Sequence, residues 1–372
     1  CRALSCGKKK NKEKQQQVHV IGGNFMERYI AIDAGKHGTK VAAYTKGNET
    51  AKTFMFLTKI GEGDFRDDAL EKQTAIIEYN GKIYKVGKGA TEAATMDTSK
   101  HDEIHKVCAL AAIAMCCSTR EEDVVHVAIG MPVNEWENVS KRVEFKDFIF
   151  PKGKITMKVK LKADSPVTTR TFTIDSTHVY PETQGALFIG DTINTGKTAV
   201  IDLGHKNNNC TVWDDFELDH KYSITGNLGG GRLISRIARA LSKEFTFCDD
   251  STVEKLLEGP EEERYLHSNK QDEEIKEKSR AIIKEEMLKH VKEIRKECDE
   301  SEWPIDYMTL FFIGGTSLLL TEQIVEVFGK GIYIPEKPEY ANCLGFLRVM
   351  CGKLLDVKIG MPEYIDNIVD AA

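Results

Sequence analysis

Two short segments carry residue types suited to phosphate chemistry. Residues 30–35 and 200–204, about 170 residues apart, are apolar runs that end in an Asp-x-Gly turn, and each leads through a polar turn into a second apolar run. Backbone N–H groups of a glycine-containing turn can approach phosphate oxygens closely, and a carboxylate at a strand end can hold Mg²⁺ through its water shell. Asp33 and Asp202 are therefore candidate carboxylates of a nucleotide site, although a single such Asp is more often only a turn former.

A third element strengthens this interpretation. Gly314, Gly315 and Thr316 stand between an apolar run and a helical pattern. A close backbone approach at a helix N-terminus suits adenosine or an adjacent phosphate. Lys40, seven residues after Asp33 on the strand that leaves the first turn, could reach back to a phosphate. Because the strand-and-turn unit occurs twice, the sequence predicts two similar half-domains that face one another across a cleft.

The elements that must position these residues are indicated by hydrophobic periodicity and turn chemistry. The Asn80-Gly81 pair is the strongest two-residue hairpin signal in the chain. We expect hairpins within 29–44, 75–86, 155–175 and 198–214, and single strands at 124–129 and 307–313. We expect helices at 101–117, 184–190, 233–241, 317–328 and 341–355, and one long solvated amphipathic helix within 261–300. Strands alternating with helices predict an α/β fold.

Composition excludes several classes of protein. The 372 residues are 41% hydrophobic and 30% charged, which is typical of a globular chain with more than one core. No apolar run approaches the roughly 18 residues that a membrane span requires. The ten cysteines form no CxxC pair, so we expect reduced cytoplasmic thiols and no zinc site.

Charge divides the chain near Met26. Residues 1–25 carry a formal charge of +5, so the remainder of the net −6 chain carries −11. We expect Met26 to be the natural start and residues 1–25 to be either an upstream remnant or a disordered basic tail. The functional alternative is a basic arm that touches anionic lipid or nucleic acid. An acidic body argues against direct binding of nucleic acid by the folded part.

The order and content of these motifs resemble those of the actin-like ATPases, and among them the ParM-type plasmid-segregation actins. The similarity runs from about residue 28 to about residue 352. The segments that carry it are IAIDAGKHGTK, IGMPVNEW, VYPETQGALF, AVIDLGHKNNNCTVW, LFFIGGTSLLL and YANCLGFLRV. This resemblance implies the actin-like fold shared with chaperones and sugar kinases, in which two duplicated α/β lobes enclose a nucleotide cleft.

The resemblance also implies roles at matching positions. Glu182 and Asp202 would be catalytic, with Glu182 orienting the attacking water and Asp33 and Asp202 facing Mg²⁺. The remaining implied nucleotide contacts are Gly35, Lys36, His37, Gly38, Lys40, Gly204, His205, Lys206, Asn207, Gly229, Gly230, Gly314, Gly315 and Thr316. The expected ligands are ATP or ADP with Mg²⁺, and GTP is the alternative nucleotide.

Two turns depart from the family pattern. Lys36 and His37 stand where the family has small or hydroxyl residues, and residues 205–209 replace a Gly/Thr run. Lys36 and Lys206 would either add positive charge beside the phosphates or point to solvent. These departures leave the choice between ATP and GTP open.

By the same resemblance, the chain is expected to be a cytoplasmic ATPase that assembles with itself into filaments and segregates plasmid DNA through an adaptor protein bound to centromere-like DNA. The alternatives are a small-molecule kinase of the same fold and a cell-shape filament. The expected domains are the tail, 1–25; a first lobe, 26–180, joined by a C-terminal helix within 335–372; and a second lobe, 181–334. No membrane contact is expected, since the basic tail lacks an apolar face.

Overall fold

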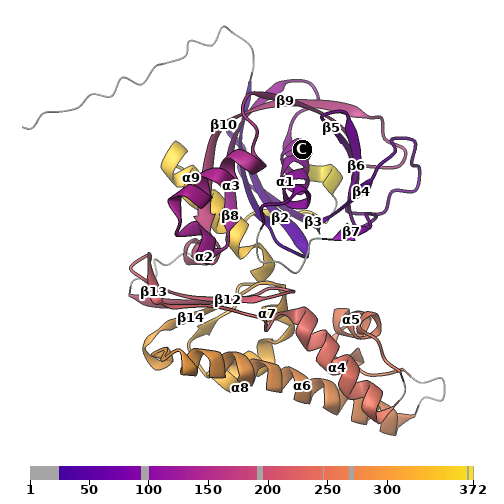
Figure 1. The fold of residues 1–372 in the computed structure, drawn as a ribbon, viewed down its shortest axis with the longest axis vertical. Coiled ribbons are helices and arrows are strands. Elements are labelled where there is room, and N and C mark those ends of the chain that lie inside the picture. Colours follow the sequence, from indigo (N-terminus) through magenta and orange to yellow (C-terminus); the bar gives the residue numbers. More distant parts are fainter. Residues whose placement is uncertain are drawn as a thin grey trace, which may run out of the picture.

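The chain folds into two lobes, each built on its own β-sheet (Figure 1). The computed structural model describes residues 25–93, 100–190, 196–245, 247–267, 272–366 and 368–371. The tail expected at 1–25 lies outside these residues except for Phe25. No helix in the described ranges has both the length and the apolar character needed to cross a bilayer.

The first lobe contains an eleven-stranded sheet, and its strand order is β16-β3-β2-β1-β8-β10-β9-β5-β6-β4-β7. The strands are β1 (Met26–Ala34), β2 (Gly38–Thr45), β3 (Lys52–Leu57), β4 (Lys59–Glu62), β5 (Thr74–Tyr79), β6 (Lys82–Gly87), β7 (Glu92–Ala93), β8 (Glu122–Met131), β9 (Lys154–Lys160), β10 (Thr168–Pro181) and β16 (Glu363–Tyr364). β8 lies parallel to both β1 and β10, so three strand ends come together at one edge of the lobe.

The three hairpins predicted in this lobe are confirmed. β1 pairs with β2 so that Asp33 stands opposite Lys40. β5 pairs with β6 through Asn80 and Gly81, whose φ angles of 51° and 76° give the left-handed pair that a two-residue hairpin turn needs. β9 pairs with β10, and a register shift in β10 lets that strand continue to Pro181.

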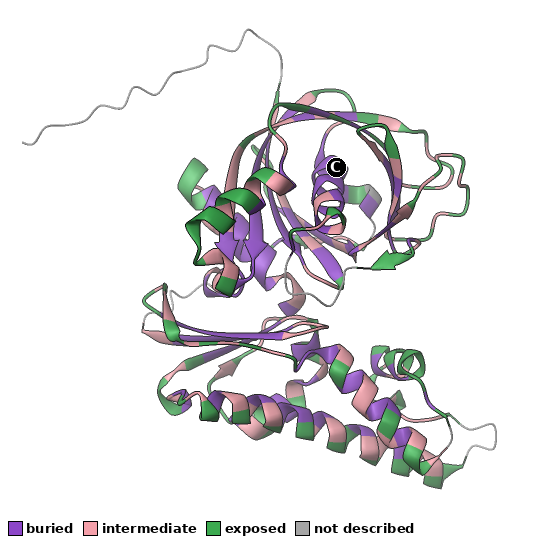
Figure 2. Cartoon of the chain, in the orientation of Figure 1, coloured by how far each residue is buried: buried purple, intermediate pink, exposed green. Residues whose placement is uncertain are grey.

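Helix α1 (Glu103–Cys116) is buried on nearly all sides, whereas its sequence pattern predicts one apolar face. Eleven of its residues are buried, and Figures 1 and 2 show the sheet curving around it. The Asp102 side chain caps its first turn by accepting from the backbone N–H of His105 at 2.8 Å. The other helical elements of this lobe are α2 (Val133–Trp136), α3 (Val139–Ile149), α9 (Ala341–Leu355) and the 3₁₀ turn η5 (Ile368–Ala371).

The second lobe has a five-stranded sheet in the order β13-β12-β11-β14-β15. Its strands are β11 (Lys197–Leu203), β12 (Asn208–Asp214), β13 (Glu217–Gly226), β14 (Thr309–Ile313) and β15 (Ile332–Tyr333). Its helices are α4 (Gly230–Glu244), α5 (Asp250–Glu258), α6 (Glu273–Glu300), α7 (Gly315–Leu319) and α8 (Thr321–Phe328), with 3₁₀ turns η2 (Glu261–Glu263) and η3 (Ile305–Tyr307). α4, α6 and α8 cover one face of the sheet (Figure 1). Strand β13 and helix α5 are not predicted by the sequence pattern.

The long helix predicted within 261–300 is confirmed as α6, which begins at Glu273; the chain before it folds back, where the Leu266 N–H donates to Ser279 Oγ at 3.0 Å. A second helix prediction in this lobe differs in its extent. The helix expected at 317–328 is interrupted at the fully buried Leu320 and continues as α8. The Thr321 hydroxyl at this break donates to the carbonyl oxygens of Ser317 and Leu318, in competition with helical bonds.

The lobes meet where the 3₁₀ turn η1 (Gln184–Phe188) packs on α9, which follows η4 (Pro338–Tyr340). Gly185 and Gly345 bring the two backbones together: a Cβ on Gly345 would lie 1.9 Å from the Gly185 carbonyl oxygen. We propose lobe boundaries at 180/181 and 334/335, because β10 ends beside this junction and α9 returns to pack on β1 and β8. The eight cysteines in the described residues are buried and free.

Candidate functional site: a cleft between the lobes

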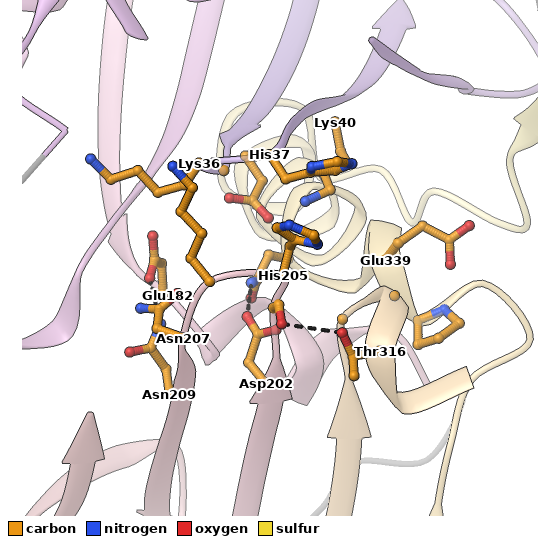
Figure 3. Close-up of a pocket in the computed structure, with 18 of the residues that line it drawn as sticks. Lys36, His37, Lys40, Glu182, Asp202, His205, Asn207, Asn209, Thr316 and Glu339 are labelled. Carbon is orange, nitrogen blue, oxygen red and sulfur yellow. Dashed lines mark hydrogen bonds between the residues drawn. The ribbon is translucent and has the colours of Figure 1, made fainter. Parts of the chain in front are cut away.

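A cavity of about 450 Å³ lies between the two sheets and receives side chains from both lobes (Figure 3). The β1–β2 turn comes from the first lobe, the β11–β12 turn comes from the second, and Glu182 lies just after β10 at the junction between them. The sequence-predicted residues that line the cavity are Asp33, Gly35, Lys36, His37, Lys40, Glu182, Asp202, Gly204, His205, Lys206, Asn207, Gly314, Gly315 and Thr316. The strand-end motifs thus converge on one space.

The first turn is closed by its own backbone. The Gly35 N–H donates to the carbonyl oxygen of Gly38 at 3.1 Å, and the Thr58 hydroxyl donates to the Gly35 carbonyl oxygen at 2.6 Å. A Cβ at position 35 would lie 2.9 Å from that Gly38 oxygen, so glycine is required for this turn. Gly38 itself packs against Met55 and does not line the cavity.

The second turn is held by two helices of its lobe, α4 and α7. The Gly204 carbonyl oxygen accepts from the Gly230 N–H at 2.9 Å and from the Thr316 hydroxyl at 3.1 Å. A Cβ on Gly229 would come within 2.4 Å of the Lys206 backbone, so the start of α4 packs directly behind the turn. Gly229 and Gly230 are therefore supports of the turn, and neither lines the cavity.

Acidic side chains gather at one end of the cleft around a buried lysine that the sequence analysis missed. Lys100 Nζ lies 2.5 Å from Glu182 Oε1 and 3.5 Å from Asp33 Oδ1. Burial alone would disfavour the lysine charge, yet the Glu182 and Asp33 carboxylates outweigh it and raise the pKa of Lys100. Lys100 precedes a helix with no motif around it, so nothing in the sequence pattern distinguishes it from other lysines.

Two asparagines that sequence reasoning also missed hold the carboxylates. Asn209 Nδ2 donates to Glu182 Oε2 at 2.9 Å, and Asn342 Nδ2 donates to Asp202 Oδ2 at 3.0 Å. Burial, followed by the charges of Asp33 and Glu182, raises the pKa of Asp202 to about 7. Lys36, Lys40, Lys100 and Lys206 line the same cavity, so it offers carboxylates to a cation and ammonium groups to phosphate oxygens.

Two histidines meet across the cleft. The rings of His37 and His205, one from each turn, stack with centroids 4.3 Å apart (Figure 3). Burial, with the neighbouring His205 and Lys40, lowers the pKa of His37 to about 4, and burial also lowers the pKa of His205. Both imidazoles are therefore neutral at pH 7, and their ring N–H groups are donors that a phosphate oxygen could accept.

The donor set suits Mg²⁺ that arrives with a phosphate ligand. Asp33, Glu182 and Asp202 offer carboxylate oxygens, which are the hard donors that Mg²⁺ prefers. The described residues contain no group of three or more side chains placed to hold a metal by themselves. Mg²⁺ characteristically binds through one or two carboxylates together with substrate phosphates and water. The cleft fits that second pattern.

Comparison with known proteins supports the same architecture. Residues 31–185 match the family described as actin like proteins, N terminal domain. The chain matches none of the curated protein sequences with which it was compared.

Several solved structures are similar over their whole length. A structure titled "Alp12 filament structure" has a TM-score of 0.67 and 26% identity, covering 88% of this chain and 99% of that one. The archaeal actin homologue Ta0583 has a TM-score of 0.70 and 18% identity, covering 88% of this chain and 99% of that one. Bacillus thuringiensis ParM with ATP has a TM-score of 0.62 and 17% identity, covering 89% of this chain and 100% of that one. The chain therefore has the actin-like fold, and its residues 31–185 match the model of the N-terminal domain of actin-like proteins.

Proposed function

We propose that this protein is an ATPase that assembles with itself into filaments and uses hydrolysis to control their turnover. The observation that carries the proposal is the opposition of two Asp-ended turns across one cleft, with the Glu182 carboxylate between them. The similar structures include one titled as a filament and one ParM described as a non-polymerisable mutant, which supports self-assembly. Others are described with ADP and with ATP, which supports a nucleotide ligand.

The residues of the cleft have different roles in the proposed hydrolysis. The turn at Gly35 and the turn at Gly204 present backbone N–H groups to the phosphates, and Lys40 adds positive charge. Asp33 and Asp202 would hold Mg²⁺, which neutralises charge on the transferred phosphoryl group. Glu182 orients a water in line with the terminal phosphate and accepts its proton.

We infer that the polymer reaches DNA through a separate adaptor protein bound to centromere-like DNA, and that it works in the cytoplasm. Residues 26–372 carry −11 in formal charge, which disfavours direct contact with the phosphate backbone. The support for plasmid segregation is the resemblance of the motifs to the ParM-type actins. A cell-shape filament remains the alternative within the same fold.

Light scattering and pelleting with MgATP test the proposal. We expect sedimentable polymer with MgATP, followed by phosphate release and disassembly. Glu182→Gln should still assemble, with phosphate release slower by about 10²–10⁴-fold, the usual contribution of general base catalysis. Glu336→Ala, at an exposed carboxylate that does not line the cavity, is the control and should behave like wild type. Absence of polymer with every nucleotide, or ADP formation that depends on an added metabolite, would contradict the proposal.

A further inference from the structure

We propose that Lys100 is a positioning residue: it fixes the direction of the Glu182 carboxylate and serves as the internal counter-ion of the carboxylates at this end of the cleft until a metal–nucleotide enters. The inference deepens the proposed function and rests on it for the role of Glu182. It assigns a function to a residue that stands outside every motif in the sequence.

The Lys100 ammonium is buried and forms ion pairs with two carboxylates of this cluster. Its side chain is 5% exposed, and its Nζ contacts Glu182 at 2.5 Å and Asp33 at 3.5 Å. Removing an ammonium from water is costly unless carboxylates compensate it. The position of Lys100 is therefore determined by the two carboxylates, and theirs by Lys100.

Glu182 is held from two sides by donors of different origin. Lys100, which precedes α1 in the first lobe, binds Oε1, and Asn209 of β12 in the second lobe binds Oε2 at 2.9 Å. The Glu182 backbone N–H donates to the Met131 carbonyl oxygen at 2.9 Å, which anchors the main chain. With both oxygens fixed, the carboxylate keeps one orientation toward the cleft, as an in-line water requires.

The charge balance gives Lys100 its second role. Asp33, Glu182 and Asp202 line one cavity, and Lys100 ion-pairs with the first two. Without the lysine charge, the carboxylates would repel one another in a partly desolvated site. A divalent cation is the natural replacement, so Lys100 and a free metal ion compete for the same oxygens.

The experiment compares Lys100→Met and Lys100→Arg with a matched control, Lys160→Met. Lys160 is also buried in the first lobe, where it donates to the carbonyl oxygens of Phe65 and Asp67 at 2.8 Å, away from the cavity. A purely structural role for Lys100 would make the two methionine variants alike. The readouts are kcat and KM for phosphate release, affinity for a fluorescent ATP analogue, and Mn²⁺ binding without nucleotide, followed by electron paramagnetic resonance.

For Lys100→Met we expect kcat to fall by about 10- to 100-fold, as for other residues that orient a catalytic group, with KM and analogue affinity changed less than about threefold. Lys100→Arg should recover part of kcat, because it keeps the charge. Lys100→Met should bind Mn²⁺ without nucleotide at least tenfold more tightly than wild type and Lys160→Met do.

An unchanged kcat in Lys100→Met, an equal loss in Lys160→Met, or equal Mn²⁺ binding in all variants would overturn the proposal. If Lys100→Met does not fold, the double variant Lys100→Met/Glu182→Gln is compared with Glu182→Gln alone, and the counter-ion role predicts that the double variant binds Mn²⁺ more tightly, through Asp33 and Asp202. Wild-type protein that releases no phosphate would refute the proposed ATPase function, and Mn²⁺ binding would still decide the counter-ion role.

Discussion

Replacing Gly345 by alanine should separate the two elements that join the lobes. A Cβ there would lie 1.9 Å from the Gly185 carbonyl oxygen and 2.4 Å from its carbon, and both opposing atoms belong to the backbone. Ordinary contact begins at 3.4 Å, so η1 and α9 must move apart by about 1.5 Å. Overpacking of this kind costs about 3 kcal/mol when no flexible side chain can yield.

The same helix offers a control. Gly352 also lies in α9, but a Cβ there would meet nothing within 4 Å. Alanine is favoured over glycine by about 1 kcal/mol in a helix interior. Gly352→Ala should therefore raise the free energy of unfolding by up to about 1 kcal/mol. Gly345→Ala should lower it by about 2 kcal/mol, because the same helix gain of about 1 kcal/mol offsets part of the overpacking cost of about 3 kcal/mol.

The Gly345 substitution should also weaken nucleotide binding in the cleft. Asn342, one turn earlier on α9, donates to Asp202 at 3.0 Å and accepts from the Thr183 N–H at 3.0 Å. A shift of about 1.5 Å would break both hydrogen bonds, so nucleotide affinity should fall together with stability. Guanidinium denaturation followed by circular dichroism, and titration with a fluorescent ATP analogue, measure the two effects. Equal denaturation midpoints for the two variants would refute the argument.

Two further predictions concern buried charges. Burial lowers the pKa of His290 to about 4. Between about pH 6.5 and pH 4 the unfolded chain therefore binds a proton that the folded chain excludes, and the free energy of unfolding falls as the pH drops through that window. His290→Gln should remove about 2 kcal/mol of this loss at pH 5, as measured by denaturation at pH 7 and pH 5. Asp123→Asn should lower the stability by about 3–5 kcal/mol, because Arg28 is buried against it at 2.6 Å, whereas Lys46→Ala at an exposed pair should cost less than about 1 kcal/mol. Equal losses in these last two variants would count against the burial argument.

Local signals in the sequence are sufficient to predict the β5–β6 hairpin and the turns of the cleft. Asn80 and Gly81 indicate a hairpin because few other pairs adopt left-handed backbone at both positions. The Asp33 and Asp202 turns are recognisable because strand, carboxylate and glycine follow one another within a few residues. The strand pairing of β1 with β2 and of β11 with β12 follows directly from these turns.

The parts of the site that depend on distant segments could not be predicted in this way. Lys100 and Glu182 are 82 positions apart in the sequence, and Asn342 and Asp202 are 140 positions apart. A lysine or an asparagine carries no local pattern that indicates its partner. The contact of Ser279 with the segment that folds back over α6 has no local signal for the same reason, although the helix itself is predicted.

The proposed function requires that the cleft hold a metal–nucleoside triphosphate with its terminal phosphate facing Glu182. A crystal structure of the Glu182→Gln variant with MgATP tests this most directly. We predict phosphates between the turns at Gly35 and Gly204, the metal on the side of Asp33 and Asp202, and the position 182 side chain directed at the terminal phosphate. Nucleotide bound outside this cleft, or a terminal phosphate beyond the reach of position 182, would contradict it.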